Sequence, residues 1–94
     1  MKASEFLQSG IDAMMDRAIL RDRPQGERSA ARASSILTAW TGQPVTEVDV
    51  WRTLLAVKLA RESQGQFHAD DYVDLASYAA LLGECQANLN DSTS

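Results

Sequence analysis

The chain has 94 residues, which is enough for one hydrophobic core and excludes a large multi-domain enzyme. Hydrophobic residues make up 45% and charged residues 23% of the sequence, so the composition is that of an ordinary folded domain rather than a disordered or membrane-spanning chain. The net charge of −4 argues against nucleic acids and anionic membranes as partners.

The sequence offers few residues for metal or disulfide chemistry. Cys85 is the single cysteine, so it has no partner for an internal disulfide, and together with the lone His68 it cannot build a thiolate metal cluster. The first residues lack the apolar run of a signal peptide, and no apolar stretch approaches the roughly 20 residues of a spanning helix. We therefore expect a cytoplasmic protein in a reducing compartment, with no cofactor.

The first half of the chain predicts two helices. Apolar residues at Leu7, Ile11 and Met14 have helical spacing, and Ser4 is a suitable N-cap for the helix that carries them. Residues 21–26 contain proline and glycine and should break this helix.

A second helix is expected from about Glu27 to Thr41, because Gly42 and Pro44 follow it and prevent continuation. Trp40 near its end, and Trp51 further along the chain, have the spacing of core anchors.

The third helix has the clearest start signal. Thr46 and Asp49 are spaced as a capping box, in which each side chain accepts a hydrogen bond from the backbone of the other residue. The helix should run from Glu47 to about Ser63. Apolar residues occur on more than one of its sides, so it is predicted to be the central, most buried element.

The last helix is predicted from near Ala69 to about Leu89, with carboxylates in its opening turns, where they favour the positive end of the helix dipole. Short connections favour antiparallel neighbours. The sequence therefore predicts an all-α fold, a compact bundle of about four antiparallel helices within a single domain of residues 1–89, followed by a disordered C-terminal tail of residues 90–94.

Charge is distributed unevenly along the chain. Residues 1–16 carry a net −2, residues 17–61 a net +4, and residues 62–94 a net −6. A basic centre followed by a wholly acidic end suggests that cations of the third helix face carboxylates of the fourth.

Lys58 and Arg61 share one face of the third helix, as do Asp71 and Asp74 on the fourth, with Tyr78 one turn further along. One interpretation is an interhelical ion-pair cluster that fixes the register of the two helices. The other is a ligand site, in which the two cations hold an anion and the aspartates orient the bases or a metal.

The first connection is a second candidate site for an anion. Glycine before a helix start frees backbone N–H groups, and arginine supplies planar donors for phosphate or carboxylate. The candidate residues here are Arg21, Arg23, Arg28, Ser29 and Arg32. The alternative is a solvated connection in which Asp22 and Glu27 neutralise the arginines.

Three segments together resemble a known group of proteins: residues 24–29, the sequence LLAVKLAR at residues 54–61, and ADDYVDLASYAALL at residues 69–82. They resemble a family of small, functionally uncharacterised proteins encoded by bacteriophages and prophages, over about residues 15–84. The resemblance implies a viral origin and a host-directed or nucleotide-related task.

More distantly, Asp71-x-x-Asp74 followed by an Ala- and Leu-rich helix looks like the second metal-binding motif of all-α, MazG-type nucleoside triphosphate pyrophosphohydrolases. That resemblance implies carboxylates from two helices that hold Mg²⁺. This chain departs from the pattern, because Lys58 and Arg61 stand where those enzymes place an acidic pair, and cations there should repel Mg²⁺.

These observations favour a phage-type, non-catalytic binding or interaction module that acts on a host protein or a small phosphorylated ligand, as a host-defence or host-takeover factor. Two alternatives remain. One is a divergent Mg²⁺-dependent nucleotide pyrophosphohydrolase that uses Asp71 and Asp74. The other is a structural, self-associating protein, since domains this small often bury apolar surface between subunits, and a homodimer would result.

Overall fold

The computed structural model describes residues 1–17 and 29–93 of the chain. These residues form helices and connecting turns, with no strand among them. In chain order the elements are α1 (Ala3–Arg17), α2 (Ser29–Thr41), α3 (Glu47–Glu62) and α4 (Ala69–Thr93). The predicted all-α bundle of four helices is confirmed.

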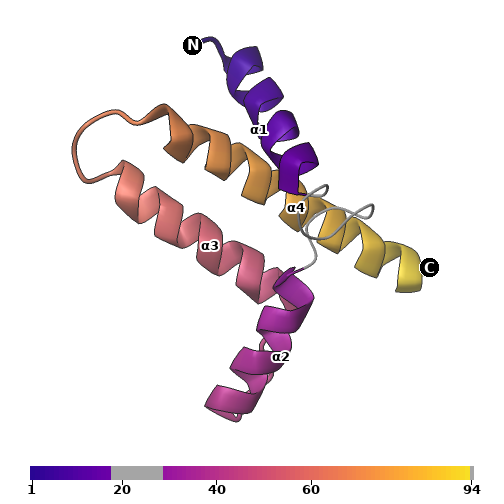
Figure 1. The fold of residues 1–94 in the computed structure, drawn as a ribbon. Helices are drawn as coiled ribbons and strands as arrows, with labels where there is room; N and C mark the ends of the chain where they lie inside the picture. Colours follow the sequence, from indigo (N-terminus) through magenta and orange to yellow (C-terminus); the bar gives the residue numbers. More distant parts are fainter. Residues whose placement is uncertain (18–28, 94) are drawn as a thin grey trace.

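Some helices pack against their neighbours in the chain, and α1 packs against the last helix. Helices α3 and α4 form an antiparallel hairpin, α1 lies on α4, and α2 packs on α3 (Figure 1). None of the described helices combines the length and apolar character needed to cross a membrane. The α3–α4 hairpin is thus the centre to which the first two helices are attached.

The core is centred on Trp51 of α3. It is 4% exposed and clusters with the buried Ala30, Val50 and Leu81, which come from α2, α3 and α4. Met14 of α1 packs against the edge of this cluster. All four helices therefore contribute to one core, and α3 supplies its largest side chain, as the sequence predicted.

Both ends of the turn between α2 and α3 follow the sequence signals. Gly42 has φ of 71° and ends α2 in the left-handed conformation that glycine adopts readily. The predicted capping box is confirmed: the Asp49 N–H donates to Thr46 Oγ1 over 3.1 Å, and the Thr46 N–H donates to Asp49 Oδ2 over 3.0 Å. The hydroxyl of Thr38 also donates to the Val45 carbonyl and accepts from its N–H.

Two helix boundaries differ from the sequence prediction. Helix α1 begins at Ala3, one residue before the expected cap Ser4, because the Glu5 carboxylate accepts a hydrogen bond from the Lys2 N–H over 3.1 Å and satisfies the start of the helix. Helix α4 continues to Thr93. The predicted end near Leu89 is therefore too early, because no glycine or proline stops the helix before Thr93.

The side chain of Trp40 corrects a further expectation. It is 80% exposed, so it is not a core anchor, whereas Trp51 is. Trp40 lies in the last turn of α2, beyond the part of that helix that meets the core cluster. The predicted helix break at residues 21–26 and the expected helix start at Glu27 lie outside the described residues.

Candidate functional site

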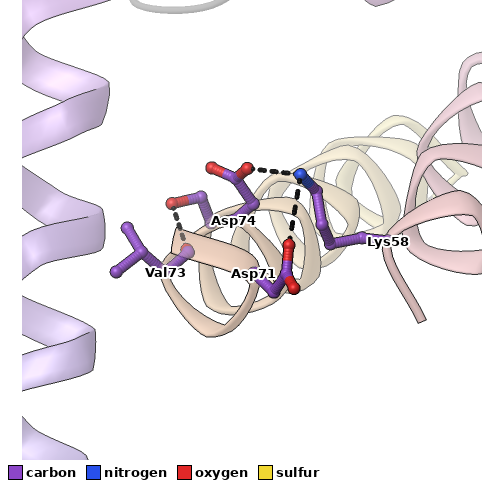
Figure 2. A network of polar contacts seen from close by, with 5 residues as sticks. Lys58, Asp71, Val73 and Asp74 are labelled. Carbon is purple, nitrogen blue, oxygen red and sulfur yellow. Dashed lines mark hydrogen bonds and ion pairs between the residues drawn. The ribbon is translucent and has the colours of Figure 1, made fainter. Parts of the chain in front are cut away.

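Lys58 joins the two helices of the central hairpin through an ion-pair cluster. Its ammonium nitrogen lies 2.8 Å from Asp74 Oδ2 and 3.8 Å from Asp71 Oδ1. Figure 2 shows the lysine reaching from α3 to both carboxylates of α4. The side chains are largely buried, at 12% exposure for Lys58, 13% for Asp71 and 21% for Asp74. The interhelical ion pair predicted from the sequence is confirmed for these three residues.

The other two members of the predicted cluster lie apart from it. Arg61 is exposed and makes no ion pair with another described residue. Tyr78 packs on the core side of the hairpin, with its ring centroid 6.1 Å from that of Trp51. Sequence spacing therefore identified Lys58 as a member of the ion-pair cluster, whereas Arg61, one helical turn further along α3, lies beyond the two aspartates and pairs with neither of them.

The cluster offers a cation to two carboxylates, which is the arrangement of a structural ion pair. Within residues 1–17 and 29–93, no three histidine, cysteine, aspartate or glutamate side chains come together as a group that could hold a metal ion. The place where Mg²⁺ would meet Asp71 and Asp74 holds the ammonium group of Lys58 instead.

Aromatic side chains cover the far end of the hairpin. Tyr72 of α4 lies between Phe6, at a ring-centroid distance of 5.7 Å, and Phe67, at 5.6 Å. Its hydroxyl donates to Glu62 Oε1 over 3.1 Å. This hydrogen bond to a carboxylate raises the pKa of Tyr72 above its ordinary value. The contacts tie α1, the turn and both hairpin helices together.

An apolar pocket lies between α2 and α3. It has a volume of about 280 Å³, and its walls are mainly aliphatic and aromatic side chains of both helices. The lining residues are Ser29, Ala30, Ala33, Leu37, Val50, Trp51, Thr53 and Leu54. We call this cavity the α2–α3 pocket.

Two exposed arginines lie on the helices that form the α2–α3 pocket. Arg32 is exposed on α2, next to the lining residue Ala33. On α3, Val57 is 45% exposed and follows the lining residue Leu54 by three positions, and the exposed Arg61 follows Val57 by four. These steps keep Val57 and Arg61 on the pocket face of α3. Each helix of the pocket thus carries one of these arginines: Arg32 lies within the stretch of α2 that lines the pocket, and Arg61 lies about 10 Å along α3 beyond Leu54.

Two further cavities have different linings. One of about 260 Å³ is lined by Glu47, Glu84 and Cys85, among others. Burial raises the pKa of the Cys85 thiol, and the carboxylates of Glu47 and Glu84 raise it further. The other, of about 250 Å³, is a groove between α1 and α4 lined by apolar and small residues. None of the three cavities is lined by Lys58, Asp71 or Asp74.

The predicted anion site is described in part. Arg21, Arg23 and Arg28 lie outside the described residues. Ser29 lines the α2–α3 pocket, and Arg32 is exposed one turn later on α2. The sequence analysis did not identify the pocket itself, because its apolar residues have the same spacing as core residues. The one available signal was that Val57 and Arg61 continue the face of Val50 and Leu54.

Fold and site together define a small all-α domain with an interhelical ion pair and an apolar pocket between α2 and α3. Its family follows from comparison with known proteins. The family described as "Domain of unknown function (DUF6378)" matches residues 13–86, well over half of the chain, so the protein belongs to that family. No curated protein and no solved structure matches the sequence.

Proposed function

We propose that this protein is a non-catalytic interaction module, encoded by a bacteriophage or prophage, that binds a protein of the bacterial host in the host cytoplasm. The observation that carries the proposal is the apolar α2–α3 pocket, whose two helices also carry the exposed arginines Arg32 and Arg61. An apolar hollow takes apolar anchor side chains of a partner, and arginines select carboxylates around them. The partner segment is therefore amphipathic and acidic.

The lining of the pocket favours a protein segment over a small phosphorylated ligand. A free phosphate needs several converging donors, but among the described lining residues only Ser29 and Thr53 contribute hydroxyls to the walls. The Thr53 hydroxyl already donates to the Asp49 carbonyl over 2.7 Å, and Ser29 also has a partner. The other described lining residues offer hydrocarbon and an indole, which match leucine-like side chains.

The ion-pair cluster supports the absence of catalysis. Lys58 lies 2.8 Å from Asp74, so a Mg²⁺ ion at this aspartate would have to displace an ammonium group that is largely buried. Under the proposal, the purified protein with Mg²⁺ releases no pyrophosphate from nucleoside triphosphates. Turnover that is lost in Asp74→Asn would establish the pyrophosphohydrolase alternative instead.

Binding can be measured with two designed peptides of matched length and leucine positions. One carries glutamates beside the leucines of an amphipathic helix, and the other carries lysines at the same positions. The reporter is the fluorescence of Trp51, which lines the pocket, in a Trp40→Phe background that removes the exposed second indole. We expect the acidic peptide to bind and the basic one not to bind.

Charge reversal on the protein identifies the surface. The double variant Arg32→Glu and Arg61→Glu should weaken binding of the acidic peptide by about tenfold or more. Arg52→Glu is the matched control, since Arg52 is exposed on α3 but two positions from both Val50 and Leu54, and so on another face. Equal binding of the two peptides, or an equal loss in the control, would refute the proposal.

A further inference from the structure

Helix α2 carries an exposed row of long side chains on a side that does not pack into the core. Arg32, Ile36 and Trp40 follow one another at four-residue steps, so they form one of the rows along which helices pack. Ile36 is 44% and Trp40 80% exposed, and Arg32 is exposed as well. The side chains of α2 that meet the core cluster, such as Ala33 and Leu37, lie on another side of the helix. We call the exposed row the α2 ridge.

Small side chains run alongside the α2 ridge. Ala31, Ser35 and Ala39 each precede a ridge residue by one position, and all three are exposed. They therefore form a parallel row of low relief on the same helix. The Ser35 hydroxyl donates to the Ala31 carbonyl over 3.3 Å, so a partner can cover it without the loss of a hydrogen bond. A raised row beside a shallow groove is the surface that two helices need for ridges-into-grooves packing.

The order of side chains along the α2 ridge is self-complementary in one direction. Arg32 and Trp40 lie four residues before and after Ile36, which is about 6 Å along the helix axis on each side. When a second α2 runs antiparallel across the first at Ile36, Arg32 of each copy meets Trp40 of the other. A guanidinium over an indole face is a favourable cation–π pair. A parallel arrangement would instead bring the two copies of Arg32 together, and like charges repel.

No described carboxylate competes for the guanidinium of Arg32. Helix α2 contains no aspartate or glutamate. Arg32 also forms no ion pair with another residue of the ranges 1–17 and 29–93. Its charge can therefore be placed over the indole of a second copy without breaking a described contact.

We propose that two copies of this chain associate through the α2 ridge, with their α2 helices antiparallel and a two-fold axis at Ile36. Each copy then supplies one arginine and one tryptophan to the other, as a two-fold contact requires. Helix α2 lies on the opposite side of the molecule from α1 and packs mainly on α3 (Figure 1), so a second α2 can approach without meeting α1. The inference goes beyond the proposed function, because no ridge residue lines the α2–α3 pocket.

Sedimentation equilibrium tests the assembly. One helix face on each copy buries less than the roughly 800 Å² per partner of a standard interface, so we expect a weak dimer with a dissociation constant of about 100 μM. Ile36→Glu places two carboxylates at the axis and should raise this constant at least tenfold. Ile11→Glu on α1 is the matched control, because Ile11 is 49% exposed against 44% for Ile36. It should leave the dimer unchanged, and both variants should keep the helical circular dichroism.

A double-mutant cycle tests the antiparallel pairing. Arg32→Ala and Trp40→Ala each remove a partner of the same cross-copy contact, so each should raise the dissociation constant at least about threefold. In the double variant the constant should rise by less than the product of the two single effects, because the contact can be lost only once. A rise equal to that product would overturn the pairing of Arg32 with Trp40.

The fluorescence of Trp40 gives a second readout. Its indole is exposed, whereas that of Trp51 is 4% exposed, so quenching by acrylamide reports mainly on Trp40. Quenching should fall as the concentration of the wild-type protein or of Ile11→Glu rises through the dissociation constant, and should stay constant in Ile36→Glu. A wild-type mass that remains that of one chain up to about 1 mM, ten times the expected constant, would overturn the inference. A dimer of undiminished affinity in Ile36→Glu, or a dimer that leaves the quenching of Trp40 unchanged, would overturn it as well.

Discussion

Gly10 decides how closely α1 can lie on α4. It is buried, and a β-carbon added there would lie 3.0 Å from Ser77 Oγ and 3.6 Å from the Val73 carbonyl oxygen. By propensity alone, alanine would favour the helix by about 1 kcal/mol. The close contact with Ser77 opposes this gain. Gly10 therefore permits the close packing of α1 on α4, although it lowers the helix propensity of α1.

Gly10→Ala should either leave the free energy of unfolding unchanged or reduce it, because the contact with Ser77 offsets the gain in helix propensity. In a Ser77→Ala background, which removes the opposing Oγ, the same substitution should be stabilising by up to about 1 kcal/mol. Urea denaturation of the four proteins of this double-mutant cycle measures the difference. An equal gain in both backgrounds would show that Ser77 does not restrict position 10.

Lys58 compensates two carboxylates that are mostly withdrawn from water. Lys58→Met should lower the free energy of unfolding by about 1–3 kcal/mol, because Asp71 and Asp74 then lose their cation. Arg61→Met, at an exposed position, should change it by less than about 0.5 kcal/mol. If thermal and urea unfolding show equal effects for the two variants, the ion pair does not stabilise the hairpin.

The thiol of Cys85 should react slowly at neutral pH. Burial and the carboxylates of Glu47 and Glu84 raise its pKa, so less thiolate is present than in a free cysteine at the same pH, and the thiolate is the nucleophile. The rate of alkylation by iodoacetamide should reach half its maximum at a higher pH than in the urea-unfolded chain. Glu47→Gln should move that midpoint down, and an unchanged or higher midpoint would contradict the assignment.

At the scale of elements, the start of α3 is held by local contacts. Thr46→Ala removes the hydroxyl that accepts from the Asp49 N–H and should cost about 1 kcal/mol of stability. Thr53→Ala is the control, because its hydroxyl only donates back to the carbonyl four residues earlier in the same helix. Thermal unfolding followed by circular dichroism measures both, and equal losses would mean that the capping box contributes nothing special.

The elements also show what the sequence could and could not predict. The capping box was found because Thr46 and Asp49 lie three residues apart, so both partners are visible in the sequence. The exposure of Trp40 and the close contact at Gly10 depend on which helix faces meet and where each contact ends. The spacing of residues within one helix does not carry this information. The α2–α3 pocket was missed for the same reason: its side chains are apolar whether they are covered or not.

The candidate site likewise has one part that the sequence predicts and one part that it does not. The interhelical contact of Lys58 with Asp71 and Asp74 could be predicted because the charges of α3 and α4 are complementary and the connection between them is short. Arg61 lies one helical turn beyond Lys58, and only the structure shows that it is exposed and pairs with neither aspartate.

At the scale of the whole molecule, the helices differ in how well they are held. The α3–α4 hairpin has the most extensive interface, an ion pair and the central Trp51, whereas α1 packs mainly on α4 and α2 mainly on α3. Elements with fewer buried contacts open at lower free energy. Helices α1 and α2 should therefore open locally at lower free energy than the α3–α4 hairpin.

Amide hydrogen exchange measures this order. We expect the slowest exchange in α3 and the first half of α4, and faster exchange in α1 and α2, because these two helices are each attached mainly to one neighbour. Exchange in α1 or α2 as slow as in α3 would be inconsistent with this order.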